Sequence, residues 1–117
     1  MSQNEIEEIE VSIEEAKQVV ARGDLLNKLI NTPEFQELVD KGYFNDEAIR
    51  LVNLYNDPSV PVDARALVAN DLGGIGAFKR YLRVIGMMAQ TAQNEIDSHK
   101  ANLEYIQEEM SQEHGDV

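Results

Sequence analysis

Residues 75–110 read IGAFKRYLRVIGMMAQTAQNEIDSHKANLEYIQEEM, and apolar residues recur in this stretch at the spacing of one helix face. Gaps of three and four residues alternate without a break through Ile75, Phe78, Leu82, Ile85, Ala89, Ala92, Ile96, His99, Leu103, Ile106 and Met110. This alternation is the a/d pattern of a coiled-coil seam. Within residues 75–110, proline is absent and no glycine follows Gly86. We therefore predict one helix over residues 75–112, about 55 Å long at 1.5 Å per residue.

Composition limits the function classes. The chain has 117 residues, a formal net charge of −12 and no cysteine, so we expect a single domain without disulfides, thiolate nucleophiles or cysteine-ligated metals. No run of apolar residues is long enough to predict a membrane span. The first residues are polar and acidic, which argues against a secretory signal.

The acidic residues are unevenly distributed. Residues 1–24 carry seven acids and two bases, and residues 94–117 carry seven acids and one base. Residues 25–93 are almost neutral, with eight acids and seven bases. We therefore expect direct binding to nucleic acid to be unlikely, because contacts to a phosphate backbone need clustered lysine and arginine.

The amino-terminal part has its own helical register. Ile6, Ile9, Ile13, Ala16, Val20 and Gly23 again alternate gaps of three and four residues. We predict a helix over residues 1–30, with a kink or break at Gly23, that pairs antiparallel with the distal half of the long helix. The resulting seam is formed by Ile6, Ile9, Ile13, Ile96, His99, Leu103, Ile106 and Met110. The heptads leave open whether the two sides of the seam belong to one chain or to two copies.

Residues 31–74 carry several start and stop signals for short helices. Thr32-Pro33 predicts a helix start, and Gly42 predicts the end of that helix after Lys41. A second short helix is expected from about Asn45 to Tyr55, a loop over 56–61 and a third helix over 63–72. Gly73-Gly74 reads as a hinge before the long helix.

Together these patterns predict an all-α fold with a compact head of short helices packed on one long carboxy-terminal helix. Within a single domain of residues 1–117, the parts are an acidic helix (1–30), the head (31–74), the heptad helix (75–112) and a disordered tail (113–117). The expected head core around the long helix comprises Phe35, Leu38, Tyr43, Phe44, Ile49, Leu51, Val52, Leu67, Leu72, Phe78, Leu82 and Ile85.

Charged clusters are the candidate interaction sites. The acidic arm presents Glu7, Glu8, Glu14, Glu15, Glu104, Glu108 and Glu109, and the one basic cluster is Lys79, Arg80 and Arg83. That cluster could contact phosphate or the acidic arm of a neighbouring subunit, or simply balance local acids on a solvated face. His99 could fix the register of the seam or respond to pH, or be an ordinary interface histidine. Gly76 predicts close packing against another element or, alternatively, a hinge.

Catalytic motifs are missing from the sequence. It has no Walker loop, GxSxG or HExxH motif, and its carboxylates are expected on exposed helix faces. We therefore predict no enzymatic activity, no cofactor and no metal site.

The central stretch resembles a group of short helical proteins of tailed bacteriophages, often encoded near head-assembly genes. The likeness covers about residues 25–90 and rests on aromatic, glycine and proline punctuation: Thr32-Pro33-Glu34-Phe35, Gly42-Tyr43-Phe44, Glu47-Ala48-Ile49-Arg50-Leu51-Val52, Asp57-Pro58, Ile75-Gly76-Ala77-Phe78 and Tyr81-Leu82. It implies a phage origin and a role in the virion or its assembly, and it brings no catalytic residues with it.

The expected function is accordingly that of a non-enzymatic phage protein in virion assembly, or a minor virion component, located in the host cytoplasm or the virion. Its partners would be phage structural proteins or a host protein, together with further copies of itself, and no membrane is expected. The alternative is an acidic DNA-mimic-like inhibitor of a host nucleic-acid-binding protein. A packaging subunit with Lys79, Arg80 and Arg83 facing DNA is a third possibility, which the net charge disfavours.

Overall fold

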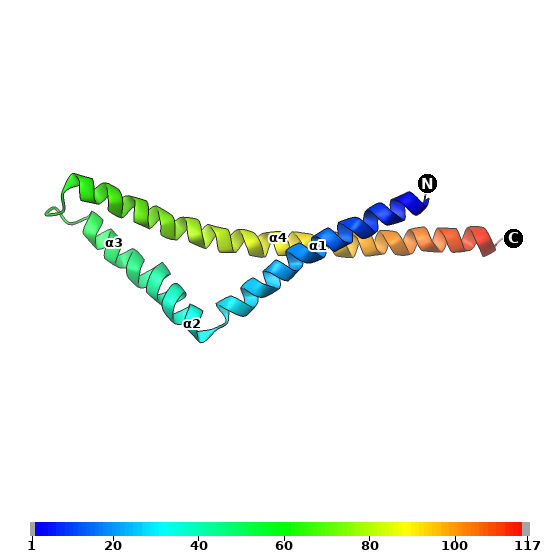
Figure 1. Cartoon of the computed structure of the whole chain (residues 1–117), viewed down its shortest axis with the longest axis horizontal. Helices are drawn as coiled ribbons and strands as arrows, with labels where there is room; N and C mark the ends of the chain where they lie inside the picture. Colours follow the sequence, from blue (N-terminus) through cyan, green and yellow to red (C-terminus); the bar gives the residue numbers. More distant parts are fainter. Residues whose placement is uncertain (1, 116–117) are drawn as a thin grey trace. The chain divides into compact units, whose positions relative to one another are not determined.

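The computed structural model describes residues 2–115, and these residues form helices without any strand (Figure 1). The elements are α1 (Ser2–Ile30), α2 (Pro33–Phe35), η1 (Gln36–Glu47), α3 (Ala48–Tyr55) and α4 (Val62–Gly115). The prediction of an all-α fold is confirmed. No helix in this part of the chain combines the length and the apolar character needed to cross a membrane.

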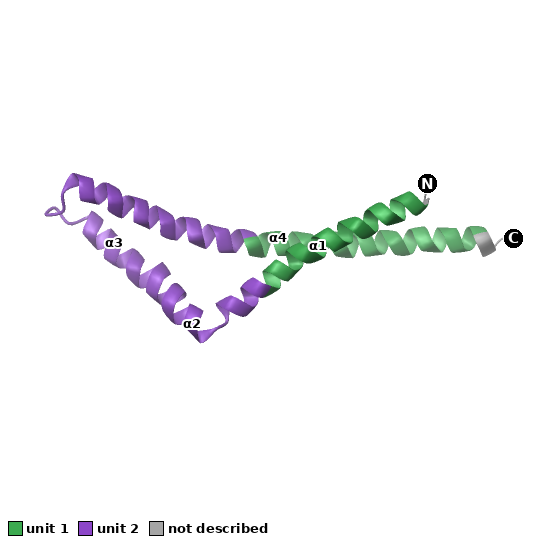
Figure 2. Ribbon diagram, in the orientation of Figure 1, with its two compact units in different colours: residues 1–24, 85–117 green, residues 25–84 purple. Residues whose placement is uncertain are grey.

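The chain divides into two units (Figure 2). Unit 1 comprises Met1–Asp24 and Ile85–Val117, and unit 2 comprises Leu25–Val84. This division follows the charge of the sequence closely. Unit 1 contains fourteen acids and three bases, a net −11, whereas unit 2 contains eight acids and seven bases, a net −1.

The predicted interruption of the carboxy-terminal helix is wrong. α4 runs continuously from Val62 to Gly115, so no hinge exists at Gly73-Gly74 and residues 113–115 are helical. A glycine in a helix costs about 1 kcal/mol, but it does not forbid helical backbone, and no glycine in the described residues has a positive φ. Leu72 and Ile75, on either side of the glycine pair, pack in the core of unit 2 and help to hold the helix there. Residues 116–117 of the expected tail lie outside the described residues.

The chain also stays helical between Pro33 and Tyr55. The predicted N-cap is present, since the backbone N–H of Phe35 donates to Thr32 Oγ1 at 3.2 Å. The predicted helix end at Gly42 is wrong, because Gly42 lies inside the twelve-residue π-helix η1. Its backbone is not left-handed, so it does not act as the helix-ending glycine that the sequence indicated.

Unit 2 has a small core rather than the compact head that was predicted. Leu51, Val68 and Ile75 are buried, with Phe44, Ala48, Leu54 and Leu72 partly buried against them. Phe35 is buried as expected, but Leu38 and Leu67 are 72% and 66% exposed. Ile49, Val52, Tyr43 and Phe78 are also exposed. These helices carry more apolar side chains than their contacts with one another can bury.

In unit 1, α1 and the distal half of α4 pack along the predicted registers. Ile13 and Ala16 of α1 form a buried cluster with Ala92 and Ile96 of α4. Partly buried side chains extend this cluster on both sides: Ile9, Val19, Val20 and Leu103. The pairing is antiparallel, because low-numbered residues of α1 meet high-numbered residues of α4, such as Ile9 with Ile106.

Candidate interaction surfaces

Gly23 is the point at which the helices of unit 1 come into close contact. Gly23 is buried, and a Cβ added to it would lie 2.3 Å from Cβ of Ala89. The expected break is therefore wrong, because α1 continues through Gly23 to Ile30. Gly23 serves close helix–helix packing, and the small residues Ala16, Ala89 and Ala92 continue the seam beside it.

The predicted seam residues all face inward to some degree. Ile6, Ile13 and Ile96 are buried, and the others are half-buried: Ile9, His99, Leu103, Ile106 and Met110. The seam is thus formed within one chain. His99 is a half-buried member of the seam.

The acidic arm residues lie on the outside of unit 1. All seven are exposed: Glu7, Glu8, Glu14, Glu15, Glu104, Glu108 and Glu109. Among the described side chains of this unit, one ion pair is formed, between Lys17 Nζ and Glu14 Oε1 at 3.2 Å. An exposed pair of this kind contributes little, so the carboxylates remain available to a partner.

One end of the acidic face is hollowed into a groove of about 400 Å³. Glu5, Glu8 and Glu109 contribute carboxylates to it, and Ile9, Asn102, Tyr105 and Ile106 complete the lining. The hydrogen bond between Tyr105 and the carboxylate of Glu109 raises the pKa of the tyrosine hydroxyl. The groove offers acidic groups beside apolar surface, a combination that suits a basic amphipathic partner. Sequence reasoning missed this groove because Glu5, Asn102 and Tyr105 lie off the heptad register.

The basic cluster lies on one exposed face of α4, in unit 2. Lys79, Arg80 and Arg83 line a groove of about 360 Å³ together with Gly76. The spacing of three, four and seven residues from Gly76 places all four on neighbouring turns. Nothing lies within 4 Å of the position of a Cβ at Gly76, so the predicted close packing at this glycine is wrong and its surface is open.

Aromatic side chains fix the position of η1 against α4 beside this groove. The rings of Tyr43 and Phe44 lie 6.2 and 5.7 Å from the ring of Phe78, centroid to centroid. Nζ of Lys79 lies 5.1 Å from the centroid of Phe44, in a cation–π arrangement. The contacts of Tyr43 and Phe44 with Phe78 and Lys79 therefore connect η1 to the basic face of α4.

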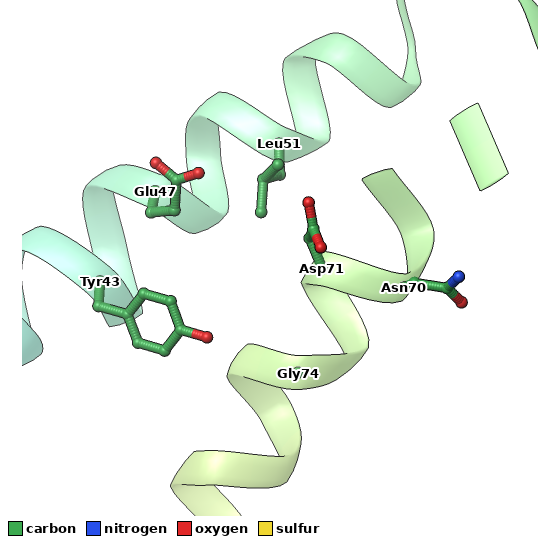
Figure 3. A pocket seen from close by; sticks show the side chains of 6 residues that line it. All are labelled: Tyr43, Glu47, Leu51, Asn70, Asp71 and Gly74. Carbon is green, nitrogen blue, oxygen red and sulfur yellow. The ribbon is translucent and has the colours of Figure 1, made fainter. Parts of the chain in front are cut away.

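A second pocket in unit 2, of about 250 Å³, lies between the η1–α3 segment and α4 (Figure 3). It is lined by Tyr43, Glu47, Leu51, Asn70, Asp71 and Gly74. Arg50 binds Glu47 with Nε and Nη2, and this hydrogen-bonded pair lowers the pKa of Glu47. Glu47 is therefore held ionised near neutral pH. The residues that line this pocket include no cysteine, serine, threonine or histidine that could act as a nucleophile beside a base.

Unit 2 exposes apolar side chains on three of its helical segments. In each case two residues one turn apart are exposed: Leu25 and Leu29 of α1, Ile49 and Val52 of α3, and Tyr81 and Val84 of α4. Twelve of the sixteen large apolar residues that are exposed in the described chain belong to residues 25–84. These exposed side chains are the candidate apolar contact positions of unit 2.

Comparison with known proteins assigns no family. The chain matches no protein-family model, and no curated protein or solved structure matches it either. Within residues 2–115, no three histidine, cysteine, aspartate or glutamate side chains gather as they would around a metal ion. The proposed function therefore rests on the interaction surfaces.

Proposed function

We propose that the chain is a non-enzymatic bacteriophage protein that acts in virion assembly, or remains as a minor virion component, by binding other proteins. Its place would be the host cytoplasm or the virion, and its contacts would include further copies of itself. The phage setting is supported by the resemblance of residues 25–90. The binding role is supported by the apolar faces of unit 2.

The exposed apolar side chains of residues 25–84 carry this proposal. Ile49 and Val52 are 54% and 44% exposed on α3, although each could be buried by a partner helix. Burying one large apolar side chain contributes about 1.5–3 kcal/mol, so a few such residues support micromolar binding. Unit 2 is nearly neutral, and partners can approach it without the charge repulsion that surrounds unit 1.

The acidic arms would contribute through their exposed carboxylates rather than through their apolar seam. Because the seam is closed within the chain, it is not the surface that reaches a partner. The exposed carboxylates of unit 1 would provide separate contacts that are reversible and salt-sensitive.

Mass spectrometry of purified virions and precursor heads tests the assembly role. The chain should be present in at least one of these particles. Its absence from both would refute the proposed role.

A matched pair of variants tests the surface. Ile49→Ser/Val52→Ser should lower recovery of partners in pull-downs from infected cells by roughly tenfold or more, because two apolar contacts are lost. Val11→Ser/Met88→Ser removes two exposed residues of unit 1 that do not line the acidic groove, and it should leave recovery unchanged. Equal recovery with both variants would contradict the assignment of the surface to unit 2.

A second candidate is the acidic inhibitor of a host nucleic-acid-binding protein. It is favoured by the net −11 of unit 1 and its single described ion pair. This role predicts binding to a host DNA-binding protein that weakens with salt and is competed by duplex DNA. Pull-downs that recover phage structural proteins alone would count against it.

A further inference from the structure

We propose that the basic groove of α4, formed by Gly76, Lys79, Arg80 and Arg83, binds an acidic helical surface, and that its occupant is unit 1 of a second copy of this chain. The inference rests on the proposed function and deepens it, because it names one partner and one surface.

The cations of the groove have no local acids to balance them. No aspartate or glutamate occurs anywhere in residues 72–94, although the chain contains 22 acids. Helical neighbours at three and four residues from Lys79, Arg80 and Arg83 are therefore all non-acidic, and none of the three forms an ion pair with another described side chain. The interpretation that this cluster balances local acids is thus disfavoured.

The surface between these cations is also open. No heavy atom lies within 4 Å of the Cβ position at Gly76. On one side, Lys79 is oriented by the ring of Phe44. Three positive charges on one open helix face suit carboxylates, because both arginine guanidinium groups can bind a carboxylate bidentately.

Charge complementarity identifies the occupant. Unit 1 carries the chain's excess of carboxylates, and its groove presents Glu5, Glu8 and Glu109 beside the apolar surface of Ile9 and Ile106. A helical acidic surface can place carboxylates on neighbouring turns, matching the spacing of the cations on α4. Duplex DNA is the alternative occupant, and the DNA-binding test below separates it from a second copy of the chain.

The contact would join different surfaces on the two copies. Two copies that exchange this contact reciprocally form a closed symmetric dimer, whereas a contact that is not exchanged repeats into a ring or a filament. Because it depends on exposed charges, it should dissociate as salt shortens the screening length to a few ångströms.

Reciprocal charge reversal tests this contact by light scattering after size exclusion, with the full chain at low and high salt. At low salt the wild type should exceed its monomer mass of 13.2 kDa and should return to it at about 1 M NaCl. Arg80→Glu/Arg83→Glu and Glu8→Arg/Glu109→Arg should each weaken self-association roughly tenfold or more. Mixing the two variants should restore association, because each then meets its opposite charge.

The control Lys28→Glu/Lys41→Glu makes the same change in net charge within unit 2 but away from the groove, and it should associate like the wild type. A wild type that stays monomeric at low salt, or an Arg80→Glu/Arg83→Glu variant that associates normally, would overturn the inference. Binding of a labelled duplex DNA that is lost in Arg80→Glu/Arg83→Glu would overturn it in favour of nucleic acid. If Ile49→Ser/Val52→Ser still loses partners while the charge variants behave normally, the groove inference fails and the proposed function stands.

Discussion

Gly23 is the residue at which a single methyl group decides the packing of unit 1. The variant Gly23→Ala would place Cβ 2.3 Å from Cβ of Ala89, so the two helices must move apart. We expect unit 1 to lose about 1–3 kcal/mol, although alanine favours the helix by about 1 kcal/mol. Urea unfolding followed by circular dichroism measures the change, and Gly23→Ala/Ala89→Gly should recover much of the loss.

Gly76 provides the matched control for that substitution. A methyl group at Gly76 meets nothing within 4 Å, and α4 is helical there. We therefore expect Gly76→Ala to stabilise the chain by about 0.5–1 kcal/mol. Equal effects of alanine at Gly23 and Gly76 would contradict the close approach of α1 and α4 at Ala89.

Glu47 provides a prediction about pH. Arg50 binds its carboxylate, and the pKa of Glu47 is lowered below its ordinary value of 4.5. Because the folded pKa is lowered, the stabilisation is present above the unfolded pKa and is lost as pH falls through the folded pKa. NMR titration should show a lowered pKa for Glu47 in the wild type and an ordinary pKa in Arg50→Gln. An unchanged midpoint in Arg50→Gln would contradict the role of this pair.

At the scale of elements, the seam of unit 1 should fail independently of unit 2. Ile96 is buried and Leu103 is half-buried against α1, so Ile96→Asp/Leu103→Asp places two charges in an apolar interface. Hydrogen exchange should show lost protection in residues 2–24 and 85–115, with protection retained around Leu51 and Val68. Val11→Asp/Tyr105→Asp, at exposed positions of the same unit, should leave protection nearly unchanged.

This seam was also the element that sequence could predict best. Alternating gaps of three and four residues place Ile13 and Ile96 on inward faces in almost any pairing of the two helices. The small residues of the same register, Gly23 and Ala89, did not reveal their close contact. A glycine in a helical pattern has the same signature whether it packs closely or bends the helix.

Unit 2 was harder to predict, for two physical reasons. Gly42 and Gly73 resemble helix ends, but neighbouring packing and continued hydrogen bonding can keep glycine helical at about 1 kcal/mol each. Periodicity also cannot say which of two apolar stripes is covered. Leu51 and Val52 are adjacent in α3, yet Leu51 is buried and Val52 is exposed, and only the position of α4 makes that choice. The acid-free stretch 72–94 was visible in the sequence and could have indicated the open basic groove.

At the scale of the whole molecule, charge and packing are divided in the same way. Unit 1 has a closed apolar seam and a net charge of −11, whereas unit 2 has a small core, exposed apolar faces and a net charge of −1. Unit 1 carries most of the exposed carboxylates, and unit 2 carries most of the exposed large apolar side chains.

This division predicts that salt stabilises the two units unequally. Raising ionic strength from about 0.01 M to 0.15 M shortens the screening length from about 30 Å to 8 Å, which weakens repulsion among the exposed carboxylates of unit 1. Hydrogen exchange on dilute, monomeric protein should show protection increasing in residues 2–24 and 85–115 and changing little in residues 25–84. Glu7→Gln/Glu15→Gln should reduce this dependence, whereas Asp40→Asn/Asp46→Asn, in unit 2, should not. If the protection of unit 1 fell as salt was added, its charges would stabilise the packed helices rather than destabilise them by repulsion.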